Sequence, residues 1–443
     1  MQFTNIFVIL FLAGTGFNFV VNELLEYIDY RHRVKEGCKV PKELFGYMDS
    51  KLLKKTCEYE NEKYFLFIPR HVAGFILTLV LVLSGFYVML FNRLFYSFGS
   101  IYITALLFFF LATLPSSILS VPFDLYGEFC IEKKYGFSNM TLKMWLIDQV
   151  KSLIISLIIG IPLLMVAVFL LLYASSFWWI LLGAVYVSFS LVLSFVYPIW
   201  IAPLFNKFTP IEDSLLKARL EELLKKTGFE SKGIFMMDAS KRSRHSNAYF
   251  TGFGKNKRVV LYDTLVQQLS VDEIEAVLAH ELGHCMHHHI IKRMCFMIPF
   301  IFIILFVTSC LVKIPALYTG FGFAPETAIT VLDGGTTVEH VLPYIQFIGI
   351  FLLSLVFEGF SILFSFFTNL FSRRDEFQAD RYSAEVCSPS EVNTRPLVTA
   401  LIKLNKENLS EVTPPKIYSM IYYSHPPLLE RVRALQKIKK EPR

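Results

Sequence analysis

The chain has 443 residues, of which 54% are hydrophobic and 18% are charged, and it contains 44 phenylalanines. A soluble protein could not bury so much apolar surface, so the composition excludes a purely soluble fold and indicates a membrane protein. The net charge of +6 calls for no nucleic-acid partner, because basic residues beside membrane spans orient a protein and contact anionic lipid.

Seven segments are apolar and long enough to cross a bilayer core of about 30 Å, which takes about 20 helical residues. They are Ile6–Val21, Val72–Phe91, Ile101–Val121, Ser152–Ala174, Phe177–Ala202, Met294–Val312 and Tyr344–Phe367. The first is not expected to be a signal peptide, because no lysine or arginine precedes it and no small-residue cleavage site follows it. In the fifth, Pro198 predicts a kink or an early end.

Lysine and arginine are distributed unevenly between the segments that separate the spans. Residues 22–70 carry ten and residues 371–443 carry thirteen, whereas residues 93–100 carry one. The positive-inside rule therefore places the loops after spans one, three and five, and the C-terminal tail, in the cytoplasm.

This topology divides the chain into four parts. Residues 1–202 hold spans one to five and their loops, and residues 294–370 hold spans six and seven. Residues 203–293 form a cytoplasmic catalytic segment, and residues 371–443 form a cytoplasmic C-terminal segment that completes the site. The seven cysteines form no C-x-x-C pair and are expected to stay reduced.

The catalytic segment shows alternating strand-like and helical patterns. A polar helix is predicted near Ile211–Thr227, and short strands are predicted at Gly233–Met237 and Arg258–Tyr262, which together indicate a small sheet. A second helix is predicted to run from Ser270 to His289, because Ser270 and Glu273 form a capping box before an apolar helical repeat.

This second helix carries the pattern H-E-x-x-H from His280 to His284. Histidines at i and i+4 lie on one helix face and can converge on one zinc ion, while Glu281 is placed to take a proton from a zinc-bound water. An ordinary polar helix face is the alternative, and the capped amphipathic helix argues against it. His287 lies two turns from His280, about 10 Å away, so residues 287–289 do not complete the site with His280. His287 and His288 are interpreted as polar residues at the membrane boundary.

A separate acidic helix offers the missing ligand. Glu376 and Asp380 are spaced i and i+4 directly after span seven, and one can bind the metal while the other holds a ring N–H of a ligating histidine. Spacing alone equally allows a charged helix surface. Glu358 is the only acidic residue deep in a predicted span, and we expect it to face an internal aqueous space. The alternative is a protonated side chain bonded to a neighbouring helix.

The H-E-x-x-H pattern, Arg373 and the run Glu376–Asp380 resemble the type I CAAX prenyl proteases, which are integral-membrane zinc proteases. Further matching runs are Ile131–Phe137, Pro203–Asn206, His245–Gly252 and Tyr423–Arg431. The resemblance implies a mainly α membrane protein, with about seven transmembrane helices enclosing or abutting a gluzincin-type zinc protease domain with a small β-sheet. It implies removal of the C-terminal aaX tripeptide from prenylated CAAX proteins, with a second upstream cleavage in some substrates.

The resemblance also assigns roles to individual residues. It implies one Zn²⁺ per chain, bound by His280, His284 and Glu376, with Glu281 as the catalytic base. Asp380 is then the partner of a ligating histidine, His425 a transition-state stabiliser, and Arg431 its neighbour. Asn247 and Ala248, with Tyr249 beside them, are implied to form an edge strand that binds extended substrate. Without the resemblance, His425 is interpreted as a turn residue before two prolines, and Asn247 as a turn residue before a strand.

Three classes of function compete for this sequence. The first is the prenyl-protein endopeptidase, with prenylated proteins and membrane lipid as partners and, in a eukaryote, the endoplasmic reticulum and inner nuclear membrane as location. The second is a broad-specificity membrane quality-control zinc protease, which the three spans before residue 122 disfavour. The third is a seven-span receptor or transporter, which does not explain why Glu376 and His425 fall on the same side of the membrane as His280.

Overall fold

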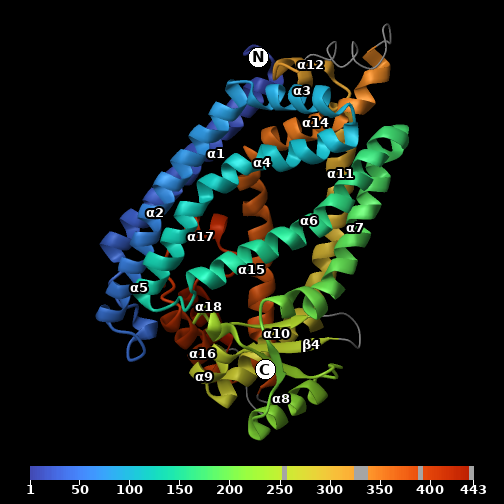
Figure 1. The fold of residues 1–443 in the computed structure, drawn as a ribbon. Coiled ribbons are helices and arrows are strands. Elements are labelled where there is room, and N and C mark those ends of the chain that lie inside the picture. Colours follow the sequence, from blue (N-terminus) through green and yellow to red (C-terminus); the bar gives the residue numbers. More distant parts are fainter. Residues whose placement is uncertain (252–256, 324–337, 388–392, 439–443) are drawn as a thin grey trace.

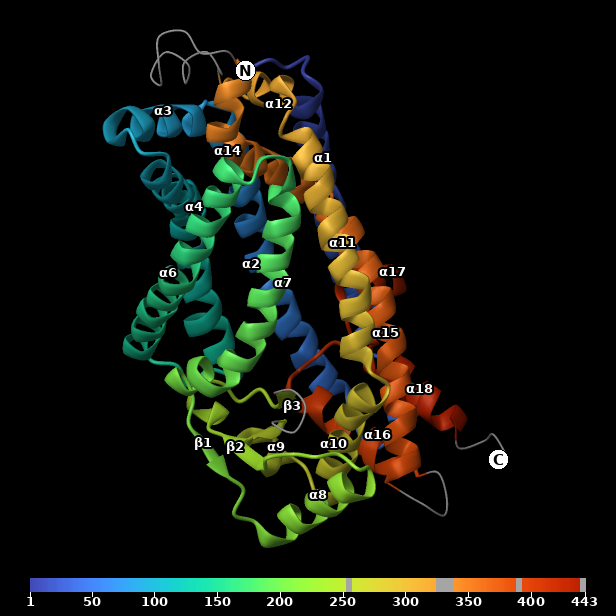
Figure 2. The same ribbon diagram turned by 90° about the vertical axis from the view of Figure 1, so that its right-hand side faces the viewer.

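The computed structural model describes residues 1–251, 257–323, 338–387 and 393–438. It is a predominantly helical molecule in which long helices run from an end that holds the N-terminus to an end that holds a small β-sheet (Figures 1 and 2). Residues 203–251, 257–293 and 371–387 gather at the sheet end. Residues 393–438 join them there, except for the helix Lys416–Tyr422, which packs on the helices Ile6–Glu36 and Ser361–Val386 farther from the sheet. The two segments predicted to be cytoplasmic thus lie together, opposite the N-terminus.

Six helices are long and apolar enough to cross a membrane, and a bent pair supplies a seventh, counted over the described ranges. This confirms the predicted membrane fold class. The six are α1 (Ile6–Glu36), α2 (Ser50–Leu83), α4 (Ile101–Tyr126) with its continuation to Tyr135, α6 (Leu142–Tyr173), α7 (Trp178–Val196) with its continuation to Leu204, and α11 (His289–Leu311). Beyond Val196 the helix changes to a π-helical turn, Tyr197–Ile201, at the predicted position of the Pro198 irregularity.

The seventh span differs from the straight helix predicted over Tyr344–Phe367. It is broken into α14 (Val338–Glu358) and α15 (Ser361–Val386), whose axes differ by 68°. The break lies against α1, where a Cβ on Gly359 would come within 2.4 Å of the carbonyl carbon of Gly14. Two glycines therefore allow the backbones to touch at the bend.

The second predicted span is also wrong at its C-terminal end. Helix α2 ends at Leu83, and Gly85 adopts a left-handed conformation with φ of 73° before α3 (Phe86–Phe98) begins. Helix α3 packs with α4, α14 and α12 (Pro315–Gly320) around an aromatic core. Phe108 is fully buried there and meets Phe351 edge-on at 5.1 Å between ring centroids.

Glu358 lies at the end of α14, in the wall of a cavity of about 490 Å³ between α1, α2 and α4. Asn18, Arg70 and His71 line the same cavity. The position agrees with the expectation that Glu358 faces an internal space. That this space holds water stays a prediction.

The sheet has four short strands in the order β1-β2-β4-β3. Strand β1 (Phe208–Pro210) runs antiparallel to β2 (Ile234–Met237), β2 runs parallel to β4 (Arg258–Tyr262), and β4 runs antiparallel to β3 (Ala248–Thr251). The predicted strands correspond to β2 and β4, and the predicted polar helix is α8 (Ser214–Lys226). The three-residue strand β1 was not predicted.

Six shorter helices belong to the segments at this end of the molecule, and one of them, Lys416–Tyr422, packs on α1 and α15 rather than on the sheet. They are α8, α9 (Asp263–Gln268), α10 (Val271–Met286), α16 (Arg395–Glu407), α17 (Lys416–Tyr422) and α18 (Leu428–Ile438). The apolar faces of α8, α10 and β4 meet in one core, with Leu220, Leu261 and Leu278 each 1% exposed or less. This core holds α10 rigidly, and α10 carries the H-E-x-x-H pattern.

A buried ionic contact joins the N-terminal helix to the C-terminal part of the chain. Arg33 of α1 donates from Nη1 to Asp29 at 2.6 Å and to Glu411 at 2.9 Å, and its Nε donates to Asn61 of α2 at 2.9 Å. All three charged side chains are 5% exposed or less. Removal of one partner of a buried ion pair leaves an unpaired buried charge, which strongly destabilises the folded state. This contact therefore holds α1 and α2 against the segment before α17.

Candidate metal centre

The helix that carries the H-E-x-x-H pattern begins where the sequence predicts. Ser270 is its N-cap, and the capping box is complete, because Ser270 N–H donates to Glu273 Oε2 at 2.8 Å while the serine side chain accepts from the first turn. The prediction that this helix extends to His289 is wrong. Helix α10 ends at Met286, and His289 is the first residue of α11.

Helix α15 crosses α10 at close range and brings the acidic residues to the histidines. A Cβ on Gly283 would lie 2.9 Å from Cα of Ala379, so the glycine in the middle of the H-E-x-x-H pattern is needed for this approach. Ser383 of α15 then donates to the carbonyl of Ala276 at 2.6 Å. These contacts fix the position of Glu376 relative to α10.

His280, His284 and Glu376 form the one group of three potential metal ligands found among the described residues. The Nε2 atoms of His280 and His284 are 3.3 Å apart, and each lies 3.3–3.4 Å from a carboxylate oxygen of Glu376. Ligands about 2.0–2.1 Å from a tetrahedral ion are themselves about 3.3–3.4 Å apart, so the three side chains are spaced to hold one metal ion.

The polar atoms of this group also fit an ion. Glu376 Oε2 is buried and accepts no hydrogen bond within the part of the chain that the structure describes. Buried oxygens without partners are rare in proteins, and a cation between the three ligands would satisfy this one. The residues present therefore fit a divalent metal with one open coordination position.

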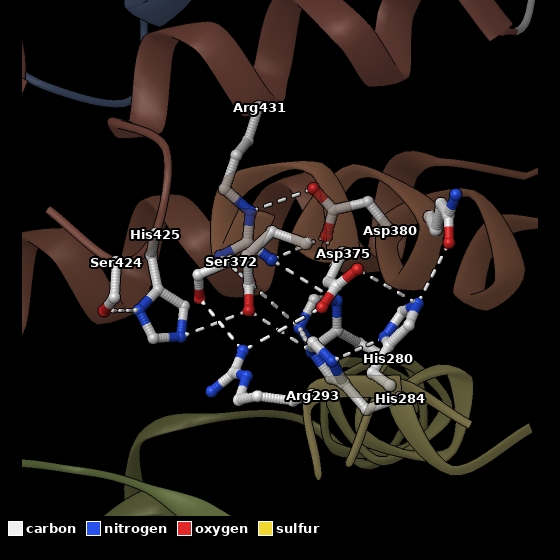
Figure 3. A network of polar contacts seen from close by, with 12 residues as sticks. His280, His284, Arg293, Ser372, Asp375, Asp380, Ser424, His425 and Arg431 are labelled. Carbon is white, nitrogen blue, oxygen red and sulfur yellow. Dashed lines mark hydrogen bonds and ion pairs between the residues drawn. The ribbon is translucent and has the colours of Figure 1, made fainter. Parts of the chain in front are cut away.

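Asp380 and Arg431 support the first histidine, as Figure 3 shows. Asp380 accepts from Nδ1 of His280 at 2.9 Å, which directs Nε2 toward the site. Arg431 donates to both oxygens of Asp380, from Nε at 2.9 Å and from Nη2 at 2.5 Å. Burial alone would lower the pKa of His280, but the hydrogen bond to Asp380 and the nearby carboxylate of Glu376 raise it to about 9.

Glu281 and His425 lie on the accessible side of the ligand group. Glu281 is partly buried, and this burial raises the pKa of its carboxyl above the ordinary value, which makes the carboxylate a stronger base. His425 is 64% exposed, and its Nε2 lies 3.3 Å from Glu376 Oε1. Ser424 Oγ contacts the other ring nitrogen, Nδ1, at 2.9 Å.

The residues expected to bind substrate lie on β3, which forms one edge of the sheet and packs against α10. Tyr262 N–H donates to the carbonyl of Asn247 at 3.1 Å. In an antiparallel pair the backbone groups of successive residues point alternately toward and away from the neighbouring strand. The backbone of Tyr249 therefore faces β4, and the backbone groups of Ala248 and Phe250 face the open edge. Asn247 precedes the strand, and its side-chain oxygen accepts from Ala248 N–H at 2.8 Å. The carbonyl of Ala248 and the backbone of Phe250 face the edge.

One buried residue beside the ligands was not predicted to contact them. His289 is 2% exposed, its Nδ1 lies 3.0 Å from Nδ1 of His284, and its Nε2 lies 3.0 Å from Oε1 of Gln378. The contact depends on His288, which breaks the helix in a left-handed conformation with φ of 55°. No sequence pattern predicts that the helix ends within this run of three histidines.

Comparisons with known proteins agree with this geometry. Residues 29–207 match a family model described as CAAX prenyl protease N-terminal, five membrane helices, and residues 210–439 match the model of peptidase family M48. The chain is 39% identical to the CAAX prenyl protease 1 homolog of Arabidopsis thaliana, over 72% of this chain and 70% of that one. It is 33% identical to the homolog of Homo sapiens, over 92% and 91%. A crystal structure of S. mikatae Ste24p superposes with a TM-score of 0.85 at 30% identity, covering 96% of this chain and 99% of that one.

Proposed function

Because this chain belongs to peptidase family M48, we propose that it is a zinc-dependent endopeptidase that removes the aaX tripeptide from prenylated CAAX proteins at a membrane. The observation that carries the proposal is the tetrahedral spacing of His280, His284 and Glu376 beside Glu281. These ligands sit where α15 leaves the membrane spans. The relatives named CAAX prenyl protease 1 support the substrate class.

In this proposal each side chain of the centre has a defined task. His280, His284 and Glu376 would hold the zinc ion, which would supply Lewis-acid chemistry for an amide carbonyl and a water molecule. Glu281 accepts the proton of the attacking water and returns it to the amine that leaves. Burial raises the pKa of Glu281, which suits both transfers, because a carboxylate that holds a proton more tightly accepts it more readily from water before returning it.

His425 stabilises negative charge that develops on the substrate, and Arg431 maintains the orientation of His280. His425 is exposed and adjacent to Glu376, so its ring N–H can turn toward the oxygen that gains negative charge during attack. The guanidinium of Arg431 is bonded to Asp380, which in turn holds the ring of His280.

The open edge of β3 suits a substrate in extended conformation. Backbone pairing with Ala248 and Phe250 would place a peptide along α10 without selecting its side chains. A prenyl group would keep the tail at the bilayer surface, and the metal centre lies at the end of the spans. We place the catalytic end in the cytoplasm and, in a eukaryotic cell, the protein in the endoplasmic reticulum and inner nuclear membrane.

Cleavage of a matched peptide pair tests the proposal. Purified protein is incubated with a farnesylated C-a-a-X peptide and with its unprenylated twin, and the products are identified by mass spectrometry. We expect one cut after the prenylated cysteine and a higher kcat/KM for the farnesylated peptide. Equal rates with cuts scattered along both peptides would instead support a broad-specificity quality-control protease.

A further inference from the structure

The two histidine ligands are held in different ways. Asp380 accepts from Nδ1 of His280, and this carboxylate is itself paired with Arg431. Among the residues that the structure describes, no carboxylate lies within hydrogen-bond distance of the corresponding atom of His284. It faces Nδ1 of another histidine, His289, at 3.0 Å.

Two ring nitrogens at this distance require that one donates and the other accepts. If Nε2 of His284 binds the metal, its proton must sit on Nδ1, and Nδ1 of His289 must accept it. The proton of His289 is then on Nε2, which faces Oε1 of Gln378 at 3.0 Å. Donation therefore runs in one direction, from His284 through His289 to Gln378.

The opposite direction is incompatible with a metal. If Gln378 donated its amide N–H to His289, then His289 would donate to His284, and the proton of His284 would move to Nε2. That proton would point at Glu376 and at Nε2 of His280, where the ion belongs. The direction of this chain of bonds thus sets which tautomer of His284 is present.

The backbone beside His289 is shaped for this contact. In an unbroken helix, residues five positions apart point about 140° away from each other and cannot meet across one face. The left-handed residue His288, with φ of 55° and ψ of 34°, ends α10 and turns the chain so that His289 lies over His284. A residue without glycine's freedom in this region carries backbone strain, and such strain is typical of functional sites.

We propose that His289 is the positioning residue of the metal ligand His284, and that it acts as a hydrogen-bond acceptor with Gln378 behind it. The inference rests on the proposed metal centre but concerns metal affinity, which is measured without any substrate. It assigns His289 a task that differs from that of His287. His287 stacks on His289 at 5.6 Å between ring centroids.

The test compares two substitutions at one position. His289→Asn keeps an acceptor near the place of Nδ1, whereas His289→Leu keeps an apolar side chain without one. Zinc dissociation constants are measured in detergent by competition with a chromophoric chelator, with His287→Asn as the control. We expect His289→Leu to weaken zinc binding roughly 10–100-fold, as loss of such supporting bonds usually does. We expect His289→Asn and His287→Asn to stay close to the parent protein.

Gln378 supplies an independent arm of the same test. Gln378→Leu should weaken zinc binding in the parent protein. It should have little further effect in His289→Asn, because asparagine lacks the ring N–H that His289 donates to Gln378. Such non-additivity marks residues that act as one unit. This arm decides the question if His289→Leu does not fold.

Two results would overturn the inference. One is equal loss of affinity in the leucine and asparagine variants of His289, which would mean that the ring itself packs the site. The other is an additive effect of Gln378→Leu in both backgrounds. Failure of the proposed function is separate, since it would leave this affinity pattern intact while the farnesylated peptide stayed uncut.

Discussion

The contact between Gly14 and Gly359 predicts a large effect from a single methyl group. An alanine Cβ at position 359 would lie 2.4 Å from the carbonyl carbon of Gly14, 2.7 Å from its Cα and 2.7 Å from the nitrogen of Thr15. Carbon atoms in contact are normally about 3.5–4.0 Å apart, so α1 and the bend would have to separate by about 1 Å. All three atoms are backbone, so no side chain can rotate to make room.

Overpacking of this kind lowers the free energy of unfolding by about 1–3 kcal/mol. We expect Gly359→Ala to fall at the upper end of this range, because whole helices must move. Gly16→Ala is the matched control, two residues along α1, where nothing lies within 4 Å of the added Cβ. There the alanine should favour the helix by about 0.5–1 kcal/mol.

Thermal unfolding in detergent, followed by size-exclusion chromatography after heating, measures both variants. Gly359→Ala should unfold at a clearly lower temperature than the parent protein, and Gly16→Ala at the same or a higher temperature. If Gly359→Ala were as stable as Gly16→Ala, the close approach of the two backbones would not be a feature of the folded protein.

Four further predictions concern the catalytic end. Glu281→Gln should keep its zinc, measured by elemental analysis, and lose peptide cleavage, whereas Glu376→Gln should lose both; a zinc-replete Glu376→Gln would refute its role as ligand. Asp380→Asn should weaken zinc binding about 10–100-fold in a chelator competition, and parent-like affinity would contradict the support of His280. Chelation should abolish cleavage by the parent protein and added zinc should restore it; full activity without metal would remove the mechanism. The sequons at Asn139 and Asn408 should carry no sugar in eukaryotic membranes, so a glycosidase-sensitive mass shift that disappears in Asn139→Gln would overturn the cytoplasmic assignment.

Local patterns predicted the parts of the structure that local interactions determine. The capping box at Ser270 begins α10 at the predicted residue, and the short strand-like run Arg258–Tyr262 gives β4 with the same bounds. The ligand spacing within α10 follows from helix geometry alone. Glu376 was one of two acidic candidates by spacing, and the resemblance to a family chose between them.

The features that sequence did not predict depend on contacts between distant segments. The bend at Gly359 requires Gly14 of another helix, and neither glycine is unusual in its own segment. Arg33 and Glu411 are 378 positions apart, so no periodicity relates them. The left-handed His288 stands in a run of similar residues, and only packing against α15 explains which histidine turns inward.

Helix α15 connects the bend at its N-terminal end to the candidate metal ligand Glu376, so the tilt of the helix determines where this ligand lies. Glu376 stands 15 residues beyond Ser361, where the helix begins, which is about 22 Å along its axis. A change of 5° in the tilt of this helix, pivoting at the bend, would displace Glu376 by about 2 Å. The contacts at Gly283 and Ser383 would pass this displacement to α10 and its histidines. Tilt responds to bilayer thickness, so the length of the lipid acyl chains should act on this active site through α15.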